Sequence, residues 1–472
     1  MSIDLRSPTF FERYQIHRTV NKYYSNFNVT AEYNQQITPE LLSNALHNLI
    51  IKNPILGCNF FRINNEDETQ DANNFRLRPI DEIKFDDIVE YTDFEVDSEY
   101  LTYLNSIRFE VDTEKPLWKL VVSQGGNKTK ISVVCNHTFF DGGSGSYFHT
   151  DLVKELNQLS DVHDKKDVIF VNDELIPEQV PAPVDSLTSL YNPPFVFKIA
   201  TMLNLFLVPT WLKNLYRRWV YPNTYKYPLF KFKPIEVGSP TNYRILHLSN
   251  EKSQSILKFT KSQGLTFTPY LTGIALKAFQ DTITPHISKG PCSMNVIIDT
   301  SGRRYYPDLE PLLKYQGCVA ASDITVEPII TPTNTFSSLK NIMNYISGIM
   351  NKDIKSRSIF HYVGLLKSVN ISQLFKKKIG SHGRATIEVS NLGCIRDIEG
   401  DIKIENMWFS QDNGFSAHIQ FSIVSTPKGG MNIVCGNLNE VEEIINPDTG
   451  TKIIDEFIKT LNDRLIQYTQ SS

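Results

Sequence analysis

Hydrophobic residues recur along the chain in two kinds of pattern. In residues 38–54 they return every three or four positions behind Thr38, which can cap a helix, so this stretch predicts an amphipathic helix. The apolar runs 117–123 and 130–136 flank the turn-forming QGGNKT and predict a β-hairpin. A helical pattern follows over 146–159, where Phe148, Leu152, Val153 and Leu156 share one face. The first half therefore combines strands with helices.

The same mixture returns in the second half of the chain. The first half also contains a predicted strand at 55–63, and strands of the second half are predicted at 243–249, 293–300, 384–393, 407–411, 416–425 and 430–438. Further helices are predicted at 250–264, 266–282, 333–353 and 448–470. Both halves pair one sheet with helices, which predicts an α/β fold (an α+β sandwich) present twice, although no exact sequence repeat is visible.

Residues 160–245 differ from both halves, because they contain a charged stretch, several prolines and one long apolar run. This composition is typical of a partly irregular connection. We therefore expect an N-terminal domain at 1–185, a crossover at 186–240 and a C-terminal domain at 241–472. With 472 residues the chain is long enough for each domain to bury its own core.

One apolar segment, 195–219, raises the question of a membrane. Its uncharged part runs from Ile199 to Leu212, which is about 21 Å as a helix and shorter than the ~30 Å hydrocarbon layer. Pro209 interrupts it further, so a spanning helix is not expected. Two interpretations stay open: a helix lying on a membrane surface, as the basic residues that follow suggest, or a buried crossover helix.

Charge and cysteine usage exclude several classes of protein. The net charge is −4 and the basic residues are scattered, which argues against nucleic-acid binding. Six cysteines occur without a CxxC pair, which argues against a zinc site and a disulfide framework. Residues 1–15 contain acids and arginines where a signal peptide requires an apolar run. A cytoplasmic protein is expected.

The stretch NHTFFDGGSG, residues 136–145, holds a histidine at a predicted strand-to-helix corner. A structural histidine is the simplest interpretation of His137. A metal site would need further ligands, and the following helix should carry His149 away. A hydrolase elbow would need G-x-S-x-G, whereas 142–146 read GGSGS, and the glycines precede no Lys-Ser or Lys-Thr of a phosphate loop.

The remaining chemical interpretation of His137 is a general base. Such a base needs a fixed ring orientation and a defined tautomer. Asp141 can brace the loop by pairing with a cation elsewhere in the chain. Gly142 and Gly143 permit a sharp turn and would leave room for a substrate beside the imidazole.

These residues resemble a known family. H-x-x-x-D-G after an apolar strand is similar to the acyl-CoA-dependent acyltransferases related to chloramphenicol acetyltransferase. The ordered set of motifs best resembles the fungal alcohol acetyltransferases and sphingoid-base N-acetyltransferases within that superfamily. The matching segments are KPLWKLVV (115–122), NHTFFDGGSGSYFHTDL (136–152), IDTSGRRYYP (298–307), KYQGCVAAS (314–322), VSNLG (389–393) and 409–433. The DFGWG run of the plant members is absent, and SQDNG (410–414) occupies a comparable place.

The resemblance implies two chloramphenicol acetyltransferase-like domains forming a pseudo-dimer, with a tunnel between them for CoA and acceptor. His137 would be the general base, and Asp141, with Gly142 beside it, would support the site by pairing with Arg303. Arg304 is an alternative partner, and the arginine pair is alternatively a solvated turn. Ser390 and Asn391 are candidates for stabilising the oxyanion, or alternatively only end a strand.

The implied activity is acetyl transfer from acetyl-CoA, without a metal, to the hydroxyl or amino group of a hydrophobic alcohol or long-chain amine. Segment 195–219 and the many aromatic residues suit a hydrophobic acceptor. We expect the protein to be a monomer. Its expected location is the cytoplasm, or the surface of the endoplasmic reticulum or of lipid droplets as a peripheral protein. The alternative is a non-catalytic lipid-binding or interaction protein on the same scaffold. A third hypothesis is a condensing or epimerising enzyme that uses carrier-bound substrates. The sequence argues against it, because no carrier or adenylation region is attached.

Overall fold

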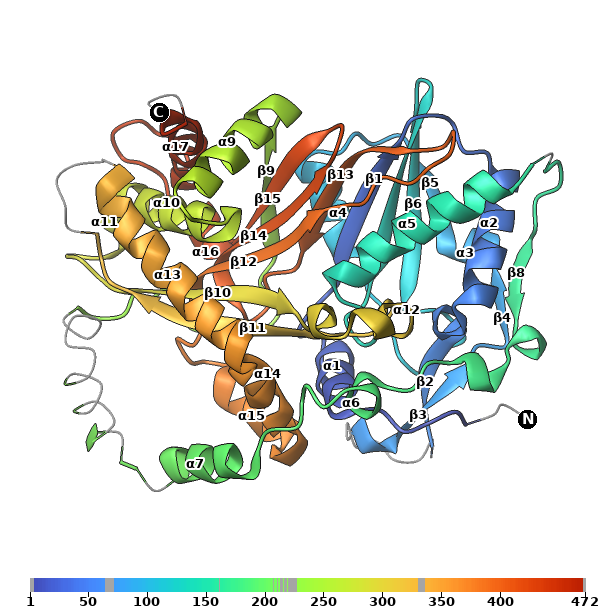
Figure 1. Ribbon diagram of the computed structural model, residues 1–472, viewed down its shortest axis with the longest axis horizontal. Coiled ribbons are helices and arrows are strands. Elements are labelled where there is room, and N and C mark those ends of the chain that lie inside the picture. The colour runs from blue at the N-terminus through green and yellow to red at the C-terminus, as the bar shows by residue number, and fades with distance from the viewer. Residues whose placement is uncertain are drawn as a thin grey trace.

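Two β-sheets, each with its own helices, form the two lobes of the protein in a computed structural model (Figure 1). The structure describes residues 4–63, 72–160, 162–206, 208, 209, 211, 212, 215, 219, 227–329 and 336–469. This mixed α/β, two-lobed architecture agrees with the predicted fold class. The division at 185 and 240, the pseudo-dimer relation and the tunnel stay predictions.

The first lobe is built around a five-stranded sheet. Its strands, in spatial order, are β13 (Ile404–Gln411), β1 (Phe27–Tyr33), β7 (Lys128–Cys135), β6 (Trp118–Gly125) and β5 (Val89–Thr92). Strands β6 and β7 are the predicted hairpin, and they pair antiparallel. Helices α2 (Pro39–Lys52) and α5 (Gly142–Gln158) contact each other beside this sheet, and α4 (Ser98–Ser106) lies against β1.

The second lobe contains a six-stranded mixed sheet. Its strands, in spatial order, are β11 (Val319–Val326), β10 (Met294–Ser301), β12 (Ala385–Cys394), β14 (Ala417–Thr426), β15 (Gly430–Leu438) and β9 (Thr241–Leu248). One face carries a large apolar core built with helices α9 (Asn250–Ser262), α10 (Phe267–Thr282), α13 (Phe336–Ser356) and α17 (Ile453–Gln467). Burial of this face is the main force that holds the lobe together.

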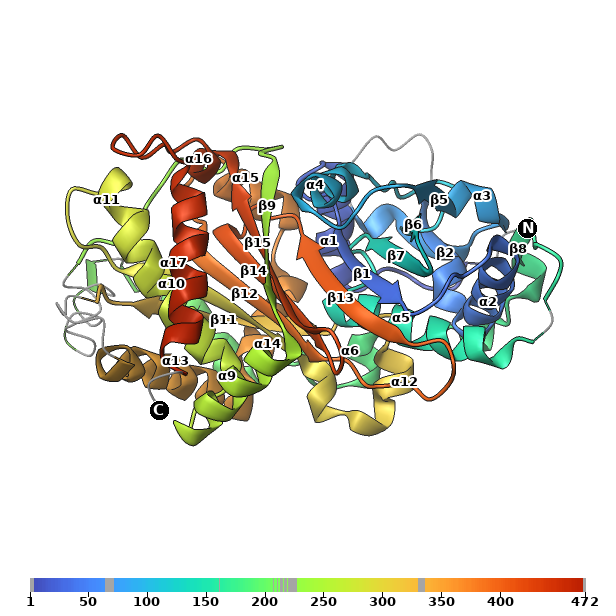
Figure 2. The same ribbon diagram turned by 90° about the horizontal axis from the view of Figure 1, so that it is seen from above.

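Strand β13 links the lobes. It comes late in the chain, between two strands of the second sheet, yet it pairs along its whole length with β1 of the first sheet. Figure 2 shows it crossing from one lobe to the other. Residues 404–411 therefore belong to the first sheet, although they lie far beyond the first 185 residues of the chain.

Small elements complete the two lobes. Two-stranded sheets are formed by β2 (Cys58–Arg62) with β3 (Phe75–Pro79) and by β4 (Glu82–Lys84) with β8 (Val168–Val171). The remaining helices are α1 (Phe10–Val20), α3 (Phe85–Ile88), α6 (Val184–Leu187), α7 (Phe195–Phe206), α11 (Thr284–Ile287), α12 (Glu310–Leu313), α14 (Ser358–Gly364), α15 (Ile371–Lys378) and α16 (Asn439–Glu442).

Some predicted boundaries differ from the observed ones. The strand predicted at 55–63 begins only at Cys58, because Pro54 opens a 3-10 turn first. The C-terminal helix begins at Ile453 rather than 448. Helix α13 begins at Phe336, and residues 333–335 of the predicted helix 333–353 lie outside the described residues.

Candidate active site

The loop between β7 and α5 carries His137 and is held by its own side chains. Asn136 continues the β-ladder by donating its N–H to the Leu117 carbonyl at 2.9 Å. The Asn136 side-chain oxygen accepts hydrogen bonds from the Thr138 N–H at 2.9 Å and the Thr138 hydroxyl at 2.6 Å. These local bonds fix the chain direction at His137 as it leaves the strand.

The His137 ring is fixed in orientation and tautomer. Its Nδ1 lies 2.7 Å from the carbonyl oxygen of Phe140. A carbonyl oxygen only accepts, so Nδ1 donates and the lone pair belongs to Nε2. The ring packs against Phe27 and Tyr24, with centroids 4.6 and 5.1 Å away. The loop therefore holds the neutral imidazole as a proton acceptor.

The surroundings of His137 disfavour its charged form. Burial lowers the pKa of His137 to about 4, and the positive charge of Arg18 acts in the same direction. The side chain nevertheless remains partly accessible. It lines a pocket between the lobes together with Arg18, Tyr24, Glu388, Gln411, Asp412, Asn413 and Gln420.

Asp141 joins three elements at the start of α5. It is the N-cap of that helix and accepts a hydrogen bond from the Ser144 N–H at 3.0 Å. The Arg303 guanidinium lies 2.8 Å from its other oxygen, which also accepts from the Cys318 N–H at 2.9 Å. Burial would raise the pKa of Asp141, but the charge of Arg303 and these hydrogen bonds lower it below its ordinary value.

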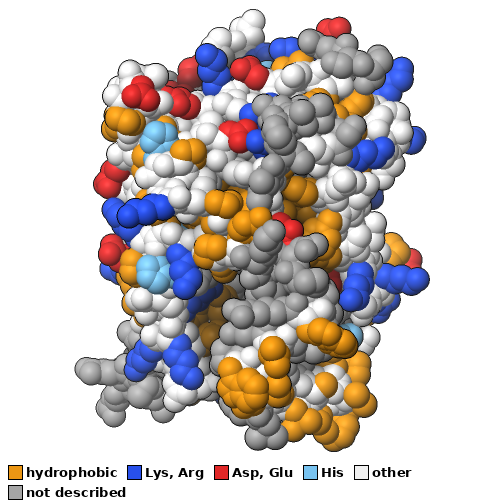
Figure 3. Space-filling view, turned by 90° about the vertical axis from the view of Figure 1, so that its left-hand side faces the viewer, with side chains coloured by type: hydrophobic (Ala, Val, Ile, Leu, Met, Phe, Trp, Pro, Cys, Tyr) orange, Lys and Arg blue, Asp and Glu red, His pale blue; other side chains and the backbone are white. Residues whose placement is uncertain are grey.

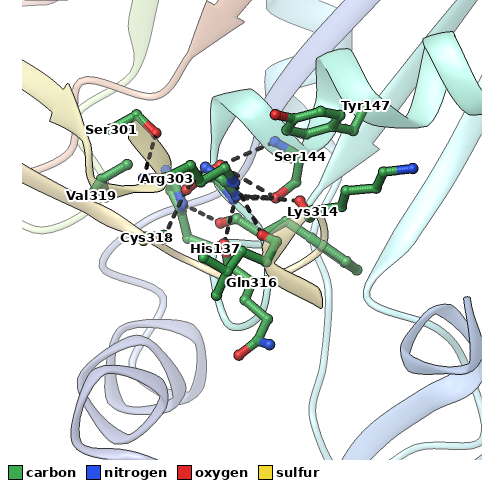
Figure 4. A network of polar contacts seen from close by, with 12 residues as sticks. His137, Ser144, Tyr147, Ser301, Arg303, Lys314, Gln316, Cys318 and Val319 are labelled. Atoms are coloured by element: carbon green, nitrogen blue, oxygen red, sulfur yellow. Dashed lines mark hydrogen bonds and ion pairs between the residues drawn. The ribbon is translucent and has the colours of Figure 1, made fainter. Parts of the chain in front are cut away.

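Arg303 is buried and fully engaged (Figure 4). It lies in a 3-10 turn, Gly302–Tyr305, directly after β10. Its nitrogens donate to the carbonyls of Leu313 at 3.0 Å and Gln316 at 2.7 Å. The neighbouring Arg304 is exposed. The structure thus pairs Asp141 with Arg303 and not with Arg304.

The glycines after Asp141 form the first turn of α5. This helix begins at Gly142 rather than at 146, because Asp141 caps it. A Cβ on Gly142 would stand 2.9 Å from side-chain atoms of Leu392 and Phe409. A Cβ on Gly143 would stand 3.0 Å from the Arg303 guanidinium. The expectation that these glycines leave room for a substrate is wrong, because protein side chains fill that space.

Ser390 and Asn391 point to opposite sides of β12. Asn391 donates to the Thr268 hydroxyl at 3.2 Å and accepts from the Gly393 N–H at 2.8 Å. Its amide is therefore occupied on the side of α10. Ser390 is buried and shares the other strand face with Glu388, since alternate residues of a strand face the same way.

Several pocket residues were not expected from the sequence. Arg18 stacks on Tyr24 at 4.2 Å and belongs to α1, whose capping box is formed by Thr9 and Glu12. The spacing T-x-x-E at 9–12 could have revealed this helix. Glu388 lies in the alternating stretch ATIEVS, where a charged residue in a core strand is the available signal.

His149 lies in the core of the first lobe. Its two ring nitrogens lie 2.8 Å from the Tyr33 hydroxyl and 2.8 Å from the Val29 carbonyl oxygen. Within the described part of the chain, no three His, Cys, Asp or Glu side chains are grouped as metal ligands would be.

The sequence matches the family model described as alcohol acetyltransferase over residues 9–465. The chain therefore belongs to the alcohol acetyltransferase family, and it is an acyltransferase enzyme.

Two yeast relatives from Saccharomyces cerevisiae carry names of the same kind. The N-acetyltransferase SLI1 is 22% identical over 461 residues, which cover 92% of this chain and 96% of the relative. Alcohol O-acetyltransferase 1 is 24% identical over 355 residues, 69% of this chain and 64% of the relative.

Solved structures share the fold. The TRI3 trichothecene 15-O-acetyltransferase of Fusarium sporotrichioides superposes with a TM-score of 0.65 at 13% identity and covers 97% of this chain and 94% of its own. The condensation domain of the monacolin K polyketide synthase MokA gives 0.61 at 10% identity, covering 99% of this chain and 98% of its own.

Proposed function

We propose that the protein transfers the acetyl group of acetyl-CoA to the hydroxyl or amino group of a hydrophobic acceptor, with His137 as the general base. The observation that carries this proposal is the Nδ1 contact of His137 with the Phe140 carbonyl. It leaves Nε2 as a proton acceptor in an accessible pocket between the lobes. The low pKa of His137, caused by burial and Arg18, keeps the imidazole neutral at pH 7.

In the proposed reaction, Nε2 of His137 takes the proton of the acceptor O–H or N–H as that atom attacks the thioester carbonyl. The tetrahedral intermediate then collapses, the C–S bond breaks, and the CoA sulfur receives the proton from His137. This direct transfer needs no covalent enzyme intermediate. An amine acceptor must first lose the extra proton of its ammonium form, because only the free amine has a lone pair.

Asp141 and Arg303 are proposed to act through position rather than through proton transfer. Their ion pair fixes the start of α5, and Gly142 lets that helix approach β13 closely. Of the two proposed oxyanion contacts, Ser390 is the better placed, because it shares the strand face of the pocket residue Glu388, whereas Asn391 contacts Thr268 on the side of α10. CoA and the acceptor would enter a tunnel between pseudo-symmetric lobes from opposite ends.

The proposed activity is tested by incubating the purified protein with acetyl-CoA and a panel of long-chain alcohols and amines. Release of free thiol that depends on the acceptor, and an acetyl ester or amide identified by mass, are the expected results. Acetyl-CoA binding without transfer to any alcohol or amine would instead favour the non-catalytic lipid-binding alternative.

We further propose that α7 binds a membrane surface, from which the hydrophobic acceptor enters the protein. This helix lies within the apolar segment 195–219. Phe195 and Val196 are 75% and 77% exposed, and Ile199 and Leu203 are also exposed. Figure 3 shows the side of the molecule that is at the left in Figure 1, and hydrophobic side chains gather at its lower end. Phe197 anchors α7 on Tyr362, with ring centroids 4.9 Å apart. An apolar helix face presented to solvent is typical of a peripheral membrane protein.

No described helix is long and apolar enough to span a bilayer.

The membrane proposal is tested by sedimentation with vesicles of phosphatidylcholine and phosphatidylserine. The double substitution Phe195→Ser and Val196→Ser should release the protein into the supernatant. Ile176→Ser, which changes another exposed apolar residue, is the matched control and should leave sedimentation unchanged. Unchanged sedimentation of the double variant would show that α7 does not bind the vesicles.

A further inference from the structure

The second sheet turns a polar face toward the His137 pocket. In β12, Ile387 and Val389 pack in the helical core, so Glu388 and Ser390 face the other way. Neighbouring β14 repeats the pattern, because Gln420 pairs with Glu388 and Ser422 pairs with Ser390. Polar residues thus lie side by side at the sheet centre, a place where apolar ones are the rule.

A second acidic residue lies beside these polar residues of β12 and β14. Asp299 of β10 contacts both Ser390 and Glu388 through its side chain. Burial raises the pKa of Glu388, and hydrogen bonds from Ser416 and Gln420 only partly oppose that rise. Burial and the nearby Glu388 also raise the pKa of Asp299. Two adjacent carboxyl groups, Glu388 buried and Asp299 half-buried, are costly to a fold, so their presence points to a task other than stability.

Three side chains that line the pocket with His137 each have one polar atom without a hydrogen-bond partner. Oε2 of Glu388, Oε1 of Gln420 and Nε2 of Gln411 find no hydrogen-bond partner within the described part of the chain. The residues are only 7%, 3% and 8% exposed, respectively. Buried polar atoms are normally paired, so these atoms are suited to a ligand that brings its own donors and acceptors.

The two unpaired oxygens call for a ligand with hydrogen-bond donors. A simple alcohol has one O–H, and in the proposed reaction it gives that proton to His137. It would leave Oε2 of Glu388 and Oε1 of Gln420 without a hydrogen-bond donor. An acceptor with adjacent amino and hydroxyl groups can give one group to His137 and direct the others at these oxygens.

We propose, on the basis of the proposed acetyl transfer, that Glu388 and Gln420 bind the polar head of the acceptor and select long-chain amino alcohols over simple long-chain alcohols. Glu388 is then a specificity-determining residue, while His137 acts equally on either class. Gln411 would donate its free side-chain N–H to an oxygen of the head group.

The experiment is a calorimetric titration with two probes of equal chain length, a 2-amino-1,3-diol and a 1-alkanol. Wild type should bind the amino diol about tenfold tighter or more, because the ammonium group of this probe can donate to Oε2 of Glu388, and a hydrogen bond that involves a charged group is among the stronger ones. Glu388→Gln keeps the side-chain shape but replaces an acceptor by a donor. It should weaken amino-diol binding by about tenfold and leave alkanol binding unchanged.

Glu399→Gln, at an exposed position, is the matched control and should change neither affinity. Gln420→Met gives a second, independent variant of similar volume, and melting curves establish which variants are folded. Equal affinity of wild type for both probes, or equal weakening of both by the folded variants, would overturn the proposal. Selective binding without acetyl transfer would contradict the proposed activity while leaving the head-group site intact.

Discussion

The Asp141 carboxylate lies 2.8 Å from the Arg303 guanidinium, and the same carboxylate caps helix α5. One side chain therefore ties the loop of the first lobe that carries His137 to the turn after β10 in the second lobe. Because both charges are buried, each depends on the other for its stability. The proposed base is held in position by a contact between lobes.

Arg303→Ala should lower the free energy of unfolding by about 3–5 kcal/mol, because Asp141 would remain as a buried charge without its cation. Arg304→Ala is the matched control, since Arg304 is exposed and adjacent, and it should change stability by no more than about 0.5 kcal/mol. Urea unfolding measures both. Equal, small effects would show that the pair does not support the fold.

His137→Gln should reduce kcat about 10²–10⁴-fold, the usual contribution of a general base, while acetyl-CoA binding and melting temperature stay close to wild type. His163→Gln changes an exposed histidine of the same lobe and should retain full activity. The comparison uses initial rates of thiol release. Near-normal turnover by His137→Gln would exclude His137 as the base.

The activity toward a neutral alcohol should remain high as the pH falls through 6.5 and decline only near about 4. Burial and Arg18 lower the pKa of His137 to about 4, and the base must be unprotonated to act. Arg18→Gln should move this acidic decline of the pH–activity profile to higher pH, because it removes a positive charge that opposes protonation of His137. Arg13→Gln, on the same helix, should not move it.

The same shift has a consequence for stability. The folded pKa of His137 lies below the ordinary 6.5, so the unfolded chain binds a proton first as the pH falls. The stabilising contribution is present above 6.5 and is lost between there and about 4. Circular dichroism at each pH therefore distinguishes loss of the base from loss of the fold.

Gly142→Ala should destabilise the protein by about 1–3 kcal/mol, because the added methyl group would meet Leu392 and Phe409 at 2.9 Å. Gly348→Ala in helix α13 is the matched control, since its Cβ would meet open space. It should stabilise by about 0.5–1 kcal/mol through helix propensity. Chemical unfolding of both variants tests whether packing decides the outcome at Gly142.

Much of the local structure followed from sequence patterns. The hairpin of β6 and β7, helices α2, α9 and α10, and strands β14 and β15 have clear hydrophobic periods and turn residues. Strand β1 was not predicted, although it lies between β13 and β7 in the first sheet. Its Asn28 and Thr30 are fully buried, so the polar residues do not mark a solvent side.

The residues of the candidate site could also be predicted only in part from the sequence. His137, Asp141 and Arg303 stand in recognisable segments of the sequence, so the residues themselves were expected. The choice between Arg303 and Arg304 depends on which side chain the 3-10 turn buries, and adjacent arginines look alike in a sequence. The role of Gly142 likewise depends on Phe409, which a strand from the second half of the chain brings against it.

The family, the mixed α/β class and the residue proposed as the base could be predicted from the sequence, because periodicity and motif spacing are local properties of the chain. Three facts became visible only in the fold: β13 completes the first sheet, Glu388 and Gln420 face the pocket of His137, and Asn391 faces α10. These facts depend on strand pairing between residues far apart in the chain, and one step of register reverses the face of every side chain.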